Sequence, residues 1–176
     1  MWGRRPGFAT LIRIILEQQV SLAAARTMFL RLSAHAGGIA PDTVARLGIG
    51  GMRRIGLTRQ KASYCHELAL QIHQGHLDLA QIARADDESG RSRLLEVRGL
   101  GPWSVDIYYL MALRRPDIWP SGDLALAEAA YRVKRLAGRP GPEILARLAE
   151  PWAPWRSIAA RVLWHHYLST GRNGAV

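Results

Sequence analysis

Cysteine is almost absent from this sequence: Cys65 is the only one among 176 residues. A single thiol excludes an internal disulfide, a CxxC zinc site and an iron–sulfur cluster held by four cysteines. Long apolar runs are missing too, because Arg13 interrupts the best candidate, from Leu11 to Leu16, far short of the roughly 18 residues that a membrane span needs. No small-residue cleavage site follows that run, as a signal peptide would require. We therefore expect a soluble protein in a reducing intracellular setting.

Acidic residues are also scarce. The 14 Asp and Glu are outnumbered by 24 Lys and Arg, which gives a formal net charge of +10. This imbalance indicates a polyanionic partner, namely DNA, RNA or an acidic membrane surface. Lys61 and Lys134 are the only lysines, so part of the arginine excess could equally reflect genomic base composition.

Helical spacing of apolar residues dominates the chain, whereas alternating runs typical of strands are short and few. With 48% hydrophobic residues, the chain is long enough to bury a core. The sequence predicts an all-α fold, a single compact domain over 1–176 of about ten helices with an interhelical active-site cleft. The expected helices are 8–17, 21–35, 41–47, 58–74, 78–84, 87–97, 103–114, 123–137, 141–149 and 154–170.

Three of these segments carry specific expectations. In 58–74 one apolar face is predicted, with Thr58 as N-cap and Gly75 as stop. In 154–170 a second apolar stripe is predicted, and 103–114 is apolar nearly all round, so it should run through the middle of the fold. The first stripe consists of Ala62, Cys65, Ala69 and Ile72, and the second of Trp155, Ile158, Ala159, Val162, Leu163 and His166.

A tight hairpin is predicted between the helices 87–97 and 103–114. Gly99 and Gly101 bracket one aliphatic residue, and both allow a positive φ and a close approach of the backbone. Pro102 suits the first turn of the second helix, where its missing N–H costs nothing. The free N–H groups at that helix start could grip a DNA phosphate without regard to sequence. A plain corner between two helices is the alternative.

Asp123 follows a Gly/Pro-rich loop at 115–122 and reads as the N-cap of the next helix. A carboxylate there accepts backbone N–H bonds at the positive end of the helix, which favours its ionised form. Such a carboxylate stabilises an oxocarbenium-like cation during cleavage of a glycosidic bond. Asp106 and Asp117 are weaker candidates for this catalytic carboxylate. Asp106 would only cap or bridge, and Asp117 would be a solvated loop residue.

The segment from Leu11 to Arg26 is a helix, a short break at 18–21, and a second helix that Ser21 could cap. Together with the hairpin, the loop and Asp123, it resembles the helix-hairpin-helix (HhH-GPD) DNA glycosylase superfamily, in particular the alkyladenine or 3-methyladenine DNA glycosylase II type. The likeness continues through 56–62 and 154–157 and so covers nearly the whole chain, with the helix-hairpin-helix at about 87–114.

The resemblance implies a monofunctional DNA N-glycosylase of base excision repair that flips out alkylated bases, of the 3-methyladenine or 7-methylguanine type, and hydrolyses them from duplex DNA. Asp123 would be catalytic. Gln19 would fill the gap left by the flipped nucleotide. Double-stranded DNA with a damaged base is the expected partner, and the protein would be a monomer in the cytoplasm, associated with the nucleoid and not with a membrane. The further DNA-binding candidates are Gly99, Gly101, Ser104 and Lys61, where Lys61 would either buttress the hairpin or touch a phosphate.

The base pocket implied by the resemblance is aromatic, because electron-rich rings attract positively charged alkylated purines. Its candidates are Trp103, Trp164 and Tyr108. Trp103 occupies the position of the nucleophilic lysine of bifunctional family members, so no lyase step is expected. No cofactor is required, and a structural Na⁺ or K⁺ at the hairpin backbone of Val97 and Gly99 stays open.

Two departures from the family pattern stand out. Ile107 occupies a position where an aromatic pocket residue is usual, which leaves the range of lesions open. The mixed β-domain that often precedes this domain is not in the sequence, so the chain is either a compact member or a trimmed one. The alternatives are a glycosylase for oxidised or mismatched bases, and a non-catalytic helix-hairpin-helix module that only grips DNA.

Overall fold

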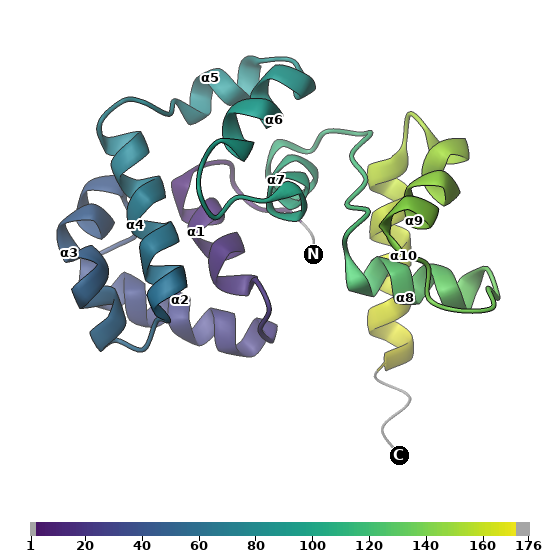
Figure 1. The fold of residues 1–176 in the computed structure, drawn as a ribbon, viewed down its shortest axis with the longest axis horizontal. Coiled ribbons are helices and arrows are strands. Elements are labelled where there is room, and N and C mark those ends of the chain that lie inside the picture. The colour runs from purple at the N-terminus through teal and green to yellow at the C-terminus, as the bar shows by residue number, and fades with distance from the viewer. Residues whose placement is uncertain (1–2, 172–176) are drawn as a thin grey trace. The chain divides into compact units, whose positions relative to one another are not determined.

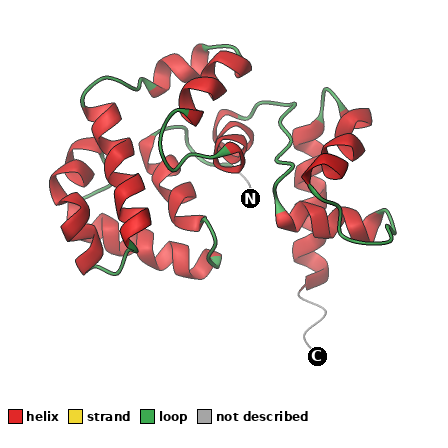
Figure 2. Cartoon of the chain, in the orientation of Figure 1, coloured by secondary structure: helices red, strands yellow, loops and turns green. Residues whose placement is uncertain are grey.

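The computed structural model describes residues 3–171, and all of their regular structure is helical (Figures 1 and 2). The predicted all-α class is confirmed. None of the described helices is long and apolar enough to cross a membrane. The chain divides into two compact units, Arg4–Tyr108 and the residues from Tyr109 onward together with Gly3. Each unit is built around its own helices, and the single domain expected over 1–176 stays a prediction.

The first unit is formed by seven helices. α1 is buried on nearly every face and contacts α2, α4 and α7, while α3 packs along α4 (Figure 1). Six side chains of α1 belong to the core, which explains the central place of this helix. Among them are all the apolar residues on either side of Arg13, from Leu11 to Leu16. The helices are α1 (Phe8–Glu17), α2 (Leu22–Ala36), α3 (Pro41–Arg54), α4 (Arg59–His73), α5 (Leu79–Arg84), α6 (Asp87–Leu95) and α7 (Pro102–Tyr108).

Local signals in the sequence predicted the helix ends well. The Ser21 hydroxyl accepts the Ala24 N–H at 3.2 Å, and the Thr58 hydroxyl accepts the Lys61 N–H at 3.2 Å. Gly75 takes the left-handed φ of 77° expected of a helix stop. Pro102 begins α7. These predictions are confirmed because each depends on residues within four positions of one another.

Helix α3 is longer than predicted. It continues to Arg54, seven residues beyond the expected end at 47. Gly48 interrupts the helical backbone with a φ of 66° and a ψ of 171°, so two short helices follow each other across a kink. Gly48, directly after the expected end, therefore marks a bend within the helix and not its end.

The predicted central helix 103–114 has two parts. After α7 the backbone passes into a π-helical segment, η1 (Tyr109–Leu113), and the boundary of the two units falls between them. Every side chain from Ser104 to Ala112 is buried, as the apolar pattern predicted. The wider π-helical turn was not predicted, because it depends on how individual carbonyls are capped; the Leu110 carbonyl accepts a bond from the Arg161 guanidinium at 2.7 Å.

The second unit contains α8 (Leu124–Val133), α9 (Pro142–Ala149), the short 3₁₀ helix η2 (Glu150–Trp152) and α10 (Arg156–Gly171). α8 packs against both α9 and α10. The predicted stripe on α10 is largely wrong: Trp155, Ile158 and Val162 are more than half exposed. Leu163 is buried as predicted, and the buried face also carries Ser157, Ala160 and Trp164, which were not part of the predicted stripe. Polar contacts of Ser157 and Trp164 orient this helix, and hydrophobic periodicity does not register them.

The hairpin turn in the first unit requires glycine at one of its two glycine positions. Gly99 has a φ of 97°, and a Cβ atom there would lie 2.3 Å from the ring of Tyr64. Gly101 does not adopt a positive φ, and a Cβ there would meet nothing within 4 Å. The predicted close approach is therefore confirmed for Gly99 and wrong for Gly101.

This difference predicts unequal costs of two alanine substitutions. Gly99→Ala should lower the free energy of unfolding by about 2 kcal/mol, from left-handed strain and the displaced Tyr64 ring. The matched Gly101→Ala should change it by less than about 0.5 kcal/mol. Urea unfolding of both variants measures these values, and equal losses would contradict the assigned role of the Tyr64 contact.

Candidate functional site

In the second unit, the side chain of Asp123 is enclosed and hydrogen-bonded. Its Oδ1 accepts the Leu126 N–H at 2.9 Å, which confirms the predicted N-cap of α8, and also the indole N–H of Trp164 at 3.0 Å. Asp123 is 9% exposed and Trp164 is 5% exposed. The carboxylate thus lies at the positive end of a helix with two N–H donors on one oxygen, an arrangement that stabilises negative charge in a partly dry place.

The loop before Asp123 is fastened to the start of α10. The Ser157 hydroxyl donates to the Arg115 carbonyl at 2.7 Å and accepts the Ile118 N–H at 2.9 Å, while the Ser157 N–H donates to the Pro116 carbonyl at 3.0 Å. Ser157 is 3% exposed. This one residue therefore fixes three consecutive parts of the loop, and nothing in the periodicity of the sequence singled it out.

Asp117 fastens the same loop by charge. Its two carboxylate oxygens accept the Nε and Nη2 protons of Arg156, each at 2.7 Å, and its Oδ1 also accepts the Arg156 backbone N–H at 3.2 Å. The hydrogen bond from the Arg156 side chain lowers the pKa of Asp117 below its usual value. The description of Asp117 as a solvated loop residue is wrong, because it caps the first turn of α10.

In the first unit, the break after α1 is joined to the hairpin. The Gln18 side-chain amide donates to the Gly99 carbonyl at 2.8 Å and to the Ser104 hydroxyl at 2.9 Å. The next residue, Gln19, is exposed and has a φ of 57°. The predicted insertion residue therefore lies beside the predicted phosphate-binding turn, and Gln18, which the sequence did not single out, connects them.

The buried lysine of α4 supports the same region from inside. Lys61 is 8% exposed, and its ammonium donates a hydrogen bond to the carbonyl of Leu16 near the end of α1. Burial lowers the pKa of Lys61, and the nearby Cys65 opposes that effect. Burial likewise raises the pKa of the Cys65 thiol to about 12. The recorded partner of Lys61 is thus the end of α1 and not the hairpin, and both roles expected for this residue stay predictions.

The three pocket candidates have different surroundings. Trp103 is half-buried on the first turn of α7, in the first unit, and Trp164 belongs to the second unit. Tyr108 is fully buried, and its hydroxyl accepts the Gly7 N–H at 3.0 Å, as expected of a core side chain. Ile107 is 2% exposed on the same helix. The roles of these residues toward a base stay predictions.

Asp106 is a structural residue. It is 6% exposed and forms an ion pair with Arg91, which joins α6 to α7. Burial raises the pKa of Asp106, while the Arg91 charge opposes that effect. The ion pair is the bridge that was expected of Asp106, and its weaker standing as a catalytic candidate stays a prediction.

A monovalent ion at the hairpin backbone, which the sequence left open, stays a prediction. The Val97 carbonyl accepts the Leu100 N–H at 3.0 Å, and the Gly99 carbonyl accepts the Gln18 amide. Each carbonyl oxygen keeps a second lone pair beyond the hydrogen bond that it accepts. Among the described residues, no group of three or more His, Cys, Asp or Glu side chains could hold a metal ion.

An all-helical chain with a two-glycine hairpin and, after a Gly/Pro-rich loop, a helix-capping aspartate defines a helix-hairpin-helix protein. The family model described as "HhH-GPD superfamily base excision DNA repair protein" matches residues 12–154. The chain therefore belongs to the HhH-GPD superfamily, as the resemblance in its sequence implied.

Individual relatives agree with this family. YfjP of Bacillus subtilis is 29% identical over 163 residues, which cover 88% of this chain and 56% of YfjP. DNA-3-methyladenine glycosylase 1 of Schizosaccharomyces pombe is 26% identical, with 92% of this chain and 72% of that protein covered. The chain spans about half the length of the first curated relatives it matches, 56% and 41% of them.

A solved structure has the same fold. It is that of the 3-methyladenine DNA glycosylase Mag1 of Schizosaccharomyces pombe in complex with abasic DNA. The TM-score is 0.84 at 25% identity, and the match covers 92% of this chain and 81% of that chain.

The Asp117–Arg156 pair predicts a pH-dependent contribution to stability. Because the pKa of Asp117 is lowered in the folded protein, the pair stabilises the fold above the unfolded-state pKa and loses this effect as the pH falls through the folded-state pKa. Asp117→Asn should lower the free energy of unfolding by about 1 kcal/mol at neutral pH and by nothing in strong acid. Urea unfolding across this pH range measures the difference.

A matched control is Asp42→Asn, since Asp42 faces Arg46 at 3.6 Å with both side chains at least half exposed. That variant should unfold like the wild type at every pH. A loss in Asp117→Asn that persists unchanged in acid would contradict the ion-pair explanation.

Proposed function

We propose that this protein is a monofunctional DNA N-glycosylase, which extrudes an alkylated base from duplex DNA and hydrolyses its glycosidic bond. The observation that carries the proposal is the Asp123 carboxylate, held at the N-terminus of α8 by the Leu126 N–H and the Trp164 indole N–H. Membership of a base excision repair family supports it.

The chemistry follows from that carboxylate. As the glycosidic bond breaks, positive charge develops on the deoxyribose ring and its oxygen, and a nearby anion stabilises this charge. Asp123 is enclosed except for 9% of its surface, so solvent screens its field weakly. The two N–H donors fix its direction before the substrate arrives, which removes the cost of reorganisation at the moment of reaction. A water molecule then attacks the sugar.

The places of the lysines favour hydrolysis over a lyase reaction. A lyase needs an amine to form a Schiff base with the sugar. The hairpin position at which bifunctional relatives carry that lysine holds Trp103 here. The ammonium of Lys61 is buried against the Leu16 carbonyl, and that of Lys134 lies over the Trp152 ring, 5.3 Å from its centroid.

The names of the relatives support alkylated bases as substrates, since several are DNA-3-methyladenine glycosylases. Double-stranded DNA is the corresponding partner, and the net charge of +10 suits a polyanion. We infer a monomer associated with the nucleoid, with no required cofactor.

Asp123→Asn should lower base release by at least about 100-fold while leaving DNA binding intact or stronger. The asparagine carbonyl can still accept the Leu126 and Trp164 N–H groups, so folding should be preserved. Labelled duplexes with different lesions, treated with alkali after incubation, measure base release. Alkali-dependent strand breaks indicate a monofunctional glycosylase, alkali-independent breaks a lyase, and no breaks a binding module.

The matched control for this experiment is Asp78→Asn. Asp78 is also an N-cap aspartate, whose Oδ1 accepts the Ala80 and Gln81 N–H groups of α5. This variant should release bases at the wild-type rate. Wild-type activity in Asp123→Asn would disprove the role assigned to the carboxylate.

Binding to DNA should weaken steeply with salt, because each phosphate contact releases condensed counterions. We expect the affinity for a lesion-free duplex to fall by at least about tenfold between about 50 and 200 mM salt. Fluorescence anisotropy with a labelled duplex measures this slope. A flat response would contradict binding through contacts with the DNA phosphates.

A further inference from the structure

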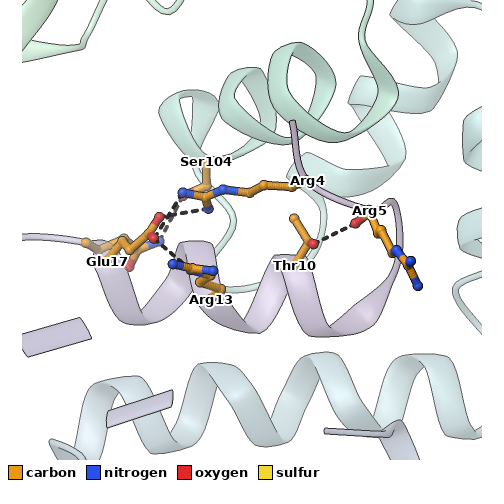
Figure 3. Close-up of polar contacts among 7 residues, drawn as sticks. Arg4, Arg5, Thr10, Arg13, Glu17 and Ser104 are labelled. Carbon is orange, nitrogen blue, oxygen red and sulfur yellow. Dashed lines mark hydrogen bonds and ion pairs between the residues drawn. The ribbon is translucent and has the colours of Figure 1, made fainter. Parts of the chain in front are cut away.

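The end of α1 is held at three consecutive residues by distant parts of the chain. Lys61 of α4 donates to the Leu16 carbonyl. Glu17 receives the guanidinium of Arg4 at 2.8 and 3.0 Å, and that of Arg13 at 3.3 Å (Figure 3). Its carboxylate side chain is only 6% exposed. A helix end is ordinarily a place where the backbone frays, and this one is fixed.

Gln18 adds the third anchor, and it faces the hairpin. Its amide nitrogen lies 2.8 Å from the Gly99 carbonyl oxygen and 2.9 Å from the Ser104 hydroxyl. Both partners have close surroundings: Ser104 is 2% exposed on α7, and the backbone of Gly99 lies so near the Tyr64 ring that a Cβ atom would clash with it. The position of Gln18, and with it the start of the next residue, is therefore fixed relative to the hairpin turn.

That residue, Gln19, has an unfavourable backbone. Its φ of 57° lies in the left-handed region, which a side chain with a Cβ disfavours. Such a conformation persists only where the surrounding structure determines it on several sides. The three anchors before Gln19 and the Ser21 cap after it provide that constraint, and the Gln19 side chain is left exposed.

We propose that Gln18 is a positioning residue, which couples the hairpin turn to Gln19 so that the grip on the DNA backbone and the filling of the gap in the duplex occur as one rigid action. This inference rests on the proposed function, because it assumes that a nucleotide leaves the stack. Because the backbone of Gln19 already has its final conformation, no conformational entropy of a loop is lost when this residue enters the duplex. That entropy loss weakens binding by loops that become ordered only in the complex.

A purely structural role for Gln18 makes a different prediction from coupling. A structural residue would act on binding independently of Gln19. A positioning residue acts through Gln19, so its removal has no further effect once the Gln19 side chain is gone. A double-mutant cycle separates the two roles.

The cycle compares the wild type, Gln18→Met, Gln19→Ala and the double variant. The probe is a duplex with a stable abasic-site analogue opposite 2-aminopurine, whose fluorescence reports a side chain entering the gap without any need for base release. Each single variant should dissociate about tenfold faster than the wild type and lose the fluorescence change. The double variant should dissociate no faster than Gln19→Ala. Additive effects would overturn the proposal.

Two further variants control for folding. Gln71→Met removes an amide that donates only within α4, to Glu67 at 3.0 Å, and should behave as the wild type. Gln18→Glu keeps the shape of the side chain and removes its N–H donors, so it should reproduce Gln18→Met. If both Gln18 variants unfold, Gln18 is a folding residue and the proposal is overturned.

The same proteins separate this inference from the proposed function. A wild type that releases no base from any lesion, together with a non-additive cycle, would refute the glycosylase and leave the coupling standing. A wild type that releases bases, together with an additive cycle, would refute the coupling alone.

Discussion

A carboxylate with little access to water must be held by donors, and the second unit of this protein is arranged to hold one. Asp123 accepts a backbone N–H at the N-terminus of α8, three residues along the chain. It also accepts the indole N–H of Trp164, 41 residues along the chain on α10. Burying an anion is costly unless its oxygens are hydrogen-bonded. The hydrogen bond from the Trp164 indole forms only when α10 has one position along its axis and one rotation about it. Ser157 and the Asp117–Arg156 ion pair fix both, because they join the start of α10 to the loop before Asp123. These contacts fix the direction of the carboxylate within the second unit.

The first unit also depends on polar side chains with little access to water, and there both charged and uncharged groups take part. Its loop after α1 is fixed by a lysine, an arginine pair and an amide, each reaching across from a distant part of the chain, and the exposed Gln19 results from them. In each unit the residue with a proposed role, Asp123 or Gln19, is positioned by polar side chains with little access to water that come from other parts of the chain.

These polar groups also explain what could be predicted from the sequence. Ser21, Thr58 and Asp123 were predicted as N-caps because a cap and its partner lie within three residues. The hairpin was predicted because its residues are contiguous, and the family because several such short motifs follow one another in a recognisable order along the chain. Ser157, Gln18 and the buried place of Lys61 were not, since their partners lie 39 to 86 positions away and leave no periodic trace. The face of α10 was predicted wrongly for that reason: an indole N–H and a serine hydroxyl turned inward, and three large apolar side chains turned out.

The solitary thiol bears on how this protein would tolerate alkylating chemicals. Methylating agents that damage purines are electrophiles, and among side chains they attack thiolates most readily. Cys65 is fully enclosed, and with a pKa of about 12 it stays protonated. The one cysteine of this chain is therefore a poor target for the alkylating agents whose lesions the protein is proposed to remove.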